Sequence, residues 1–141
     1  MGLTVTTAGD VVVSEYSNHR LKVFLKENTA EPKVIGSKGS GNCRFMCPRG
    51  LALDKQNNII VADSENHRIQ VVSINGEFIG DFGKIGWDPG SFHTPHGVAV
   101  DEDGNVIVAD TKNNRLQIFT RRVPSYDIDN REDVSTLYDC A

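Results

Sequence analysis

The feature that most constrains the fold of this sequence is a short segment that occurs three times. Residues 97–119 and residues 50–72 match closely, and residues 2–24 repeat the same pattern more loosely. The glycines that begin the three segments are separated by 48 and then by 47 positions. Self-similarity at a period of this length is typical of solenoids and β-propellers, in which each repeat is one structural unit.

Each repeat contains short runs of Val, Ile, Leu and Phe between Gly, Asn and Asp residues, which predicts short antiparallel strands joined by turns. The first strands are expected at residues 51–53 and 98–100 of the second and third repeats, and the second strands at 59–62 and 106–109. A third strand is expected at residues 116–119, and a fourth strand of the second repeat at 77–82. Four strands followed by a glycine-rich return segment make one propeller blade. We therefore predict an all-β fold, a partial β-propeller of about three four-stranded blades.

The expected boundaries follow the repeats. Residues 1–36 form the first blade, residues 37–83 an inter-blade loop and the second blade, and residues 84–120 an inter-blade loop and a partial third blade. The third blade is expected to be partial because no fourth strand is evident after Phe119. Residues 121–141 carry many acidic side chains and no repeat pattern, so we expect a mostly disordered tail, with a short helix over 130–138 as the alternative.

The composition excludes several classes of function. Of 141 residues, 38% are hydrophobic and 24% charged, which suits a globular domain with its own core. The net charge of −4 argues against a purely electrostatic nucleic-acid binder, and no DNA partner is expected. No run of apolar residues is long enough to span a membrane, so no membrane partner is expected.

The three cysteines and the start of the chain indicate a reducing compartment. Met1 leads directly into the first repeat without a targeting segment, and an odd number of cysteines suits the cytoplasm. Cys43 and Cys47 have no matching Cys or His pair, whereas structural zinc needs four ligands. We therefore expect a cytoplasmic chain without a metal or other cofactor.

An acid stands five residues before an arginine in every repeat, and an asparagine lies between them. The three pairs are Glu15 with Arg20, Asp63 with Arg68, and Asp110 with Arg115. Across a tight turn each pair can form a structural staple, which is the interpretation that we favour. The alternative is a charged functional site repeated around a ring. If the second pair is buried, removing one partner should cost about 3–5 kcal/mol.

Three recurring motifs carry a resemblance to a known family. They are Pro-x-Gly before an alternating strand that ends in Asp, a strand ending in Val-Ala-Asp, and Asn-x-Arg before a strand with Gln. Together they resemble NHL repeats, and the glycine-rich segment 36–41 followed by Phe45 and Pro48 resembles the inter-blade segment of tripartite-motif NHL proteins.

The resemblance implies a module of a closed propeller that usually has six blades. The family includes ubiquitin ligases with an N-terminal RING, B-box and coiled coil, in which the NHL domain recruits protein substrates or binds RNA. The sequence has no Cys- and His-rich RING or B-box, so ligase chemistry is not expected of these residues. We therefore expect a non-catalytic binding module that recruits a protein partner in ubiquitination, with RNA binding in post-transcriptional regulation as the alternative.

A propeller enzyme, a lyase or hydrolase, is a more remote alternative. Some propellers with this repeat are lyases that use metal-bound histidines. Here His93 and His96 are three residues apart without a carboxylate cluster, and His19 and His67 occupy equivalent positions of two repeats. We therefore expect no catalytic site.

In an up-and-down blade the turns after the second strands and the return segments lie at one end, and the other turns lie at the opposite end. The first end carries the binding candidates Arg44, Arg49, Lys84, Trp87, His93, His96, His67 and Lys112. The opposite end carries the acids 101–103. We expect Phe45 and Phe92 to pack beneath the loops, and Trp87 to be a surface residue. Open blade edges are also expected to allow self-association.

Overall fold

The computed structural model describes residues 1–120 and 134–139, and side chains for 1–120 only. The described chain is an all-β partial propeller of three four-stranded antiparallel sheets. The first blade comprises β1 (Leu3–Val5), β2 (Val11–Glu15), β3 (Arg20–Leu25) and β4 (Asn28–Ile35). The second comprises β7 (Pro48–Leu53), β8 (Ile59–Asp63), β9 (Arg68–Val72) and β10 (Phe78–Phe82). The third comprises β11 (Gly97–Val100), β12 (Val106–Asp110), β13 (Arg115–Phe119) and β14 (Val134–Asp139).

The expectation that the third blade lacks a fourth strand is wrong. β14 pairs antiparallel with β13, from Phe119 opposite Val134 to Arg115 opposite Asp139. The same strand corrects the alternative of a helix over 130–138. The segment Val134–Tyr138 is rich in residues that favour strands, and its backbone pairs with the edge of β13 that would otherwise lack a neighbouring strand. Sequence analysis missed it because residues 120–133 separate it from the repeat. The rest of the tail expectation lies outside the described residues.

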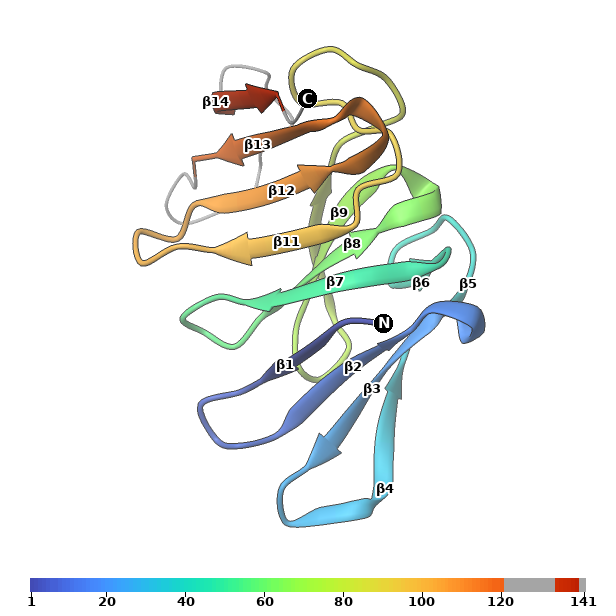
Figure 1. The fold of residues 1–141 in the computed structure, drawn as a ribbon. Coiled ribbons are helices and arrows are strands. Elements are labelled where there is room, and N and C mark those ends of the chain that lie inside the picture. Colours follow the sequence, from blue (N-terminus) through green and yellow to red (C-terminus); the bar gives the residue numbers. More distant parts are fainter. Residues whose placement is uncertain (121–133, 140–141) are drawn as a thin grey trace.

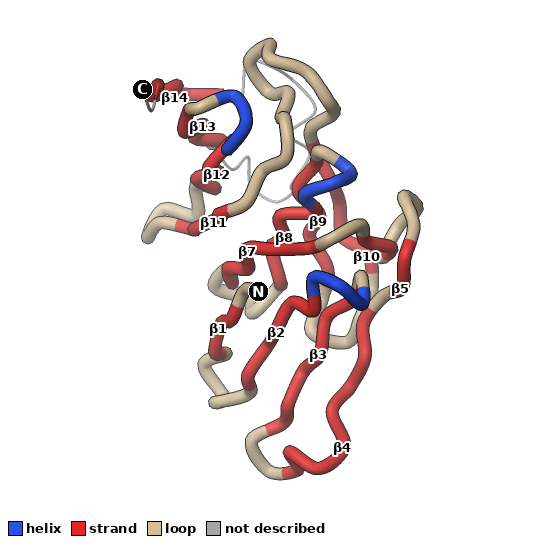
Figure 2. Tube along the Cα trace, turned by 45° about the vertical axis from the view of Figure 1, so that its right-hand side comes forward, coloured by secondary structure: helices blue, strands red, loops and turns tan. Residues whose placement is uncertain are grey.

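A 3₁₀ turn joins the second and third strands of each blade. The turns are η1 (Tyr16–Asn18), η2 (Ser64–Asn66) and η3 (Thr111–Asn113). Each ends at a residue in the left-handed region, with φ of 53° at His19 and 52° at His67 and Asn114. Figures 1 and 2 show these turns at the same end of the blades as two long segments, residues 36–47 and 83–96, which we call connector 1 and connector 2. Connector 1 contains a short parallel pair, β5 (Ser37–Lys38) and β6 (Arg44–Phe45).

The first strands of the blades, β1, β7 and β11, lie side by side along the inner edge of the fan (Figure 1). Their backbones approach closely, because the amide of Gly50 in β7 donates a hydrogen bond of 2.8 Å to the carbonyl of His96, just before β11. The connector ends of neighbouring blades therefore meet at this inner edge.

Two apolar clusters form the core, one between the first and second blades and one between the second and third. Each contains one fully buried connector phenylalanine, Phe45 or Phe92. The rings of Phe82, Phe92 and Phe119 pack together with centroids 4.8 to 6.2 Å apart. The prediction that Phe45 and Phe92 pack beneath the loops is confirmed. Each connector is thus anchored in the core by one ring.

Candidate functional site

A buried carboxylate fixes the connector to the second blade. The Asp63 side chain is fully buried and accepts hydrogen bonds from Arg68 Nε at 2.8 Å and from the backbone amide of Met46 at 2.7 Å. It also accepts from Asn66 Nδ2 and Gln70 Nε2. One carboxylate therefore holds the turn after β8, the strand β9 and connector 1 together.

The third blade repeats this arrangement around Asp110, which accepts from Arg115 Nε at 2.8 Å and from the amide of His93 at 2.7 Å. Arg115 also donates to the carbonyls of Trp87, Asp88 and Ser91, as Arg68 does to those of Gly41 and Arg44. The arginines thus shape the connectors on which candidate binding residues stand.

The first blade departs from this pattern. Glu15 accepts from Asn18 and from Arg20 at 2.8 Å each, and from Lys22 at 3.0 Å. Hydrogen bonds from Asn18, then Arg20 and Lys22 lower the pKa of Glu15 to about 2. The side chains of Glu15 and Arg20 are 15% and 34% exposed, so this site is wetter than those of Asp63 and Asp110.

The sequence candidates at the connector end divide into two groups. Arg44, Lys84, Trp87 and Lys112 are exposed on the connectors and η3, and Trp87 is 80% exposed. Arg49, His67, His93 and His96 are half-buried nearer the inner edge. Within the half-buried group, the His67 and His93 rings lie 5.5 Å apart, and Arg49 is near enough to His96 to lower its pKa.

Histidines of two turns also latch the connectors. His67 Nδ1 accepts a hydrogen bond from the amide of Thr94 at 3.0 Å, and His19 Nδ1 accepts one from Cys47 at 2.9 Å. Burial, and then the nearby His93, lowers the pKa of His67. Because a protonated imidazole has no acceptor nitrogen, this latch requires neutral histidine.

Sequence reasoning missed several residues of this end. Gln70 and Gln117 are buried, and each donates to the carboxylate of its blade and to a connector carbonyl. Both stand two residues after the arginine of their repeat, and this recurrence could have marked them as structural residues of this end. Tyr16 carries the guanidinium of Arg49 over its ring, 4.4 Å from the centroid. Its equivalents are Ser64 and Thr111, so no repeat pointed to it.

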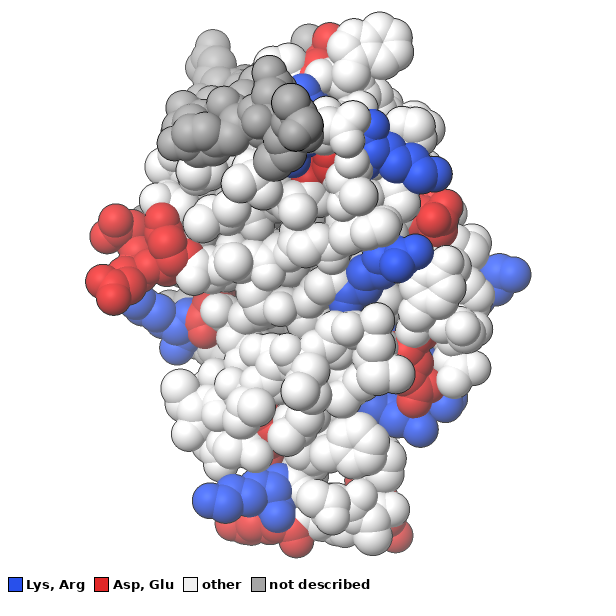
Figure 3. All heavy atoms as spheres, viewed as in Figure 1, with Lys and Arg blue, Asp and Glu red and all other residues white. Residues whose placement is uncertain are grey.

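Both ends of the blades carry charges of both signs. Figure 3 shows acidic side chains gathered on the left, where the turns between first and second strands lie. Lys and Arg side chains, in blue, are more frequent on the right. However, Lys26 and Lys55 belong to turns at the acidic end, whereas Glu65 and Asp88 lie at the connector end. The connector end is therefore a surface of mixed charge.

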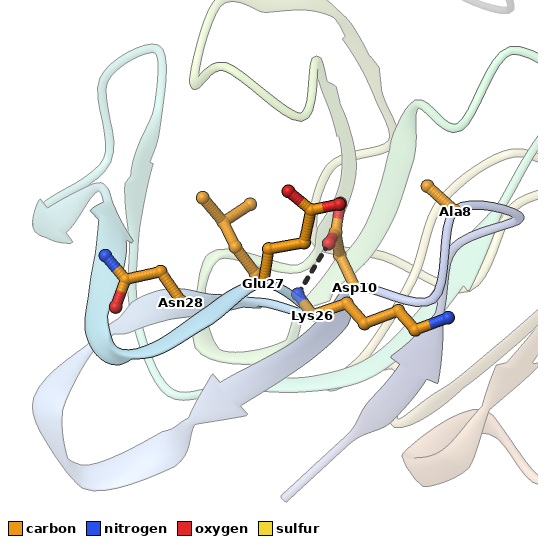
Figure 4. Close-up of a pocket in the computed structure, with 6 residues that line it drawn as sticks. Ala8, Asp10, Lys26, Glu27 and Asn28 are labelled. Atoms are coloured by element: carbon orange, nitrogen blue, oxygen red, sulfur yellow. Dashed lines mark hydrogen bonds between the residues drawn. The ribbon is translucent and has the colours of Figure 1, made fainter.

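A pocket of 410 Å³ lies at the other end of the first blade, lined by Ala8, Asp10, Leu25, Lys26, Glu27 and Asn28 (Figure 4). The carboxylate of Asp10 already accepts the amide of Lys26 at 2.9 Å. This acid therefore organises the turn between β3 and β4, and none of the sequence candidates lines the pocket.

Within residues 1–120, where side chains are described, no three His, Cys, Asp or Glu side chains lie close enough together to hold a metal ion. No helix in the described part of the chain is long and apolar enough to cross a membrane.

Comparison with known proteins agrees with this geometry. The fold is that of β-propeller proteins: it matches a streptogramin B lyase structure with a TM-score of 0.67 at 15% identity, over 84% of this chain and 36% of that one. It also matches an auxiliary nutrient binding protein from Bacteroides thetaiotaomicron with a TM-score of 0.70 at 16% identity, over 82% of this chain and 36% of that one. At these identities the likeness concerns the fold alone.

The fold and the staples define a propeller module built from sequence repeats. The NHL repeat profile matches residues 2–24, 45–72 and 92–119, more than half of the chain. The chain therefore belongs to the NHL repeat family.

Three curated relatives share parts of this sequence. Protein brain tumor of Drosophila melanogaster is 44% identical over 52 residues, which cover 37% of this chain and 5% of that protein. Protein lin-41 of Caenorhabditis elegans is 40% identical over 46 residues, covering 33% and 4%. NHL repeat-containing protein 2 of Gallus gallus is 34% identical over 92 residues, covering 60% and 12%. The first two are tripartite-motif NHL proteins, and this chain spans a small part of each relative's length.

Proposed function

We propose that this chain is a non-catalytic module that recruits protein partners through its connector end, in the manner of a substrate-recruiting scaffold of ubiquitination. The observation that carries the proposal is the pair of connectors. Buried arginine–carboxylate staples hold their backbones, while Lys84, Trp87 and Lys112 project into solvent. A rigid backbone with exposed aromatic and cationic side chains suits protein recognition, because little order is lost on binding.

The relatives support a scaffold role, since two of them are tripartite-motif NHL proteins. We further propose that the chain acts in the cytoplasm, as its odd number of cysteines suggests.

The test is ubiquitin transfer directed by this chain. A RING domain from an unrelated ligase is fused ahead of Met1, and cell extract is supplied with ubiquitin and its activating and conjugating enzymes. We expect a specific set of proteins to be modified by the fusion. The triple variant Lys84→Glu, Trp87→Ala and Lys112→Glu should lose that set.

The matched control is Lys26→Glu with Lys55→Glu, which reverses two charges at the opposite end. This control should modify the same proteins as the unchanged fusion. An identical set from the triple variant would contradict recruitment through the connector end.

RNA binding is a second candidate, favoured by the cationic and histidine side chains of the connector end. It would use phosphate contacts, so its affinity should fall steeply as salt rises. Fluorescence titration of single-stranded RNA at 50, 100 and 200 mM salt tests this. Absence of saturable binding at the lowest salt concentration would remove this candidate.

The structure offers few stacking platforms for RNA bases at this end. Phe45 and Phe92 are fully buried, and the ring of Tyr16 is covered by Arg49. Trp87 is exposed, but base recognition in single strands generally uses several aromatic platforms. We therefore rank protein recruitment first.

A further inference from the structure

Arg49 differs from the other arginines of the connector end in what its guanidinium contacts. Arg20, Arg68 and Arg115 each bind a carboxylate at 2.8 Å, and Arg44 donates to Ser37. Arg49 Nε is buried without a hydrogen-bond partner. Within the part of the chain whose side chains are described, no acid lies within ion-pair distance of it. A buried, unpaired donor is costly, and because Nε itself is out of reach of a ligand, a compensating anion would have to bind the terminal NH₂ groups.

Packing holds this guanidinium in place. It lies over the Tyr16 ring, 4.4 Å from the centroid, which is the distance of a cation–π contact. The carbonyl of Arg49 accepts a hydrogen bond from Ser14 Oγ at 2.5 Å, so the backbone is fixed to the first blade as well. The guanidinium is therefore positioned before any ligand arrives, which lowers the entropic cost of binding.

The surroundings of Arg49 contain a neutral histidine and charges of both signs. His96 directly precedes β11, and its carbonyl accepts the hydrogen bond from the Gly50 amide. Burial, then the charge of Arg49, lowers the pKa of His96. Lys112 acts on His96 in the same direction, and Glu65 opposes it. Three blades thus contribute Tyr16, Arg49 and His96 to one place at the inner edge, with one acid nearby.

We propose that Arg49, whose guanidinium stacks on the Tyr16 ring next to His96, binds a side-chain carboxylate in an acidic segment of the recruited protein. This proposal rests on the proposed function. With one face of the guanidinium covered by Tyr16, its terminal NH₂ groups offer an in-plane edge that matches a planar carboxylate. His96 supplies a second donor when its imidazole turns an N–H toward the ligand.

The test uses a fluorescein-labelled hexaglutamate peptide as the probe, with hexaglutamine and hexauridylate as comparison probes, read by anisotropy at 50 mM salt. The Arg49→Gln variant removes the guanidinium. The matched control is Arg44→Gln, which loses the same charge at the same end but leaves the stack of Arg49 on Tyr16 intact. Tyr16→Leu removes the ring and keeps the charge. Circular dichroism and urea unfolding establish that each variant is folded.

We expect hexaglutamate to bind, and Arg49→Gln to weaken that binding roughly tenfold or more, as for loss of a hydrogen bond to a charged group. Arg44→Gln should change it less than about twofold, as expected for an exposed charge. Tyr16→Leu should weaken it to an intermediate degree. Equal losses from Arg49→Gln and Arg44→Gln, or no binding of hexaglutamate, would overturn the carboxylate site. Tighter, Arg49-dependent binding of hexauridylate would overturn it in favour of RNA.

The ubiquitin-transfer fusion separates failure of this site from failure of the proposed function. If the fusion recruits proteins and Arg49→Gln recruits the same proteins equally well, only the carboxylate site is wrong. If the unchanged fusion recruits nothing, the proposed function itself is wrong.

Discussion

At the scale of single residues, the acid that ends each second strand binds other parts of the chain through its carboxylate. It binds the arginine of its own turn, and in the second and third blades it also accepts the backbone amide of an incoming connector. Burial decides how much each acid contributes. The side chains of Asp63 and Asp110 are fully buried, whereas that of Glu15 is 15% exposed.

This difference predicts unequal effects of matched substitutions. Asp63→Ala should lower the free energy of unfolding by about 3–5 kcal/mol, because it leaves Arg68 Nε and the Met46 amide buried without their acceptor, although Arg68 keeps its ion pair with Asp81 at 3.2 Å. Glu15→Ala removes a partly exposed partner held by three hydrogen bonds and should cost less, about 1.5 kcal/mol. Urea unfolding of both variants measures the difference. Similar losses of unfolding free energy in the two variants would contradict the view that the Asp63 ion pair is buried and the Glu15 ion pair is partly exposed.

The histidine latch predicts a pH dependence of stability. Because the pKa of folded His67 is lowered below its usual value near 6.5, its contribution is complete above that pH. It is lost as the pH falls from 6.5 through the folded pKa, since the unfolded state then binds the proton more readily. Urea unfolding between pH 7.5 and pH 5 should therefore show falling stability.

His67→Asn is the matched variant, since Asn114 occupies the equivalent left-handed position of the third blade. It should cost about 1 kcal/mol at pH 7.5 through the lost bond to the Thr94 amide, and it should flatten the fall at lower pH. An unchanged slope in this variant would show that His67 is not the titrating latch.

At the scale of elements, the first strands of neighbouring blades meet through glycine. A Cβ at Gly50 would overlap the carbonyl oxygen of His96 at the start of the next strand, and backbone cannot easily move aside. At Gly97, the equivalent residue of the third blade, the nearest atom is the Ala109 Cβ at an ordinary 3.4 Å. Equivalent glycines therefore face different demands.

Gly50→Ala should destabilise the chain by about 1–3 kcal/mol through overpacking between the second and third blades. Gly97→Ala should be neutral or slightly stabilising, because it only restricts the unfolded chain. Thermal unfolding of the two variants compares them directly. A neutral Gly50→Ala would indicate that β7 and β11 are less closely packed than described.

The elements also mark how far sequence reasoning reached. Strands, connectors and acid–arginine positions could be predicted, because each recurs with the repeat. The contact of Tyr16 with Arg49 could not, since it joins a residue unique to one blade with the variable position of Pro-x-Gly. β14 was missed for a related reason: its pairing with β13 crosses a long segment that has no repeat character.

At the scale of the whole molecule, the first blade leaves apolar side chains in solvent. Leu3, Val5 and Val34 are 65%, 56% and 51% exposed. The equivalent faces of the second and third blades pack against the preceding blade, whereas exposed apolar surface favours association. Light scattering across a concentration series should therefore show a mass above 15.5 kDa that rises with concentration.

The double variant Val5→Lys and Val34→Lys should lower that mass toward the monomer, because charges on a sheet face oppose stacking. Glu102→Lys, which places a lysine in an exposed turn of the third blade, is the control. A concentration-independent monomer of the unchanged chain would contradict self-association.

The central claim, that partners are met at the connector end, is tested most directly by photo-crosslinking in cells. A photoreactive phenylalanine replaces Trp87 or Lys112 at the connector end, or Glu102 at the opposite end. These three residues are all exposed, so access to the crosslinker is comparable. We predict discrete protein adducts from Trp87 and Lys112 and none from Glu102. Adducts from Glu102 alone, or equal adducts from both ends, would contradict the claim.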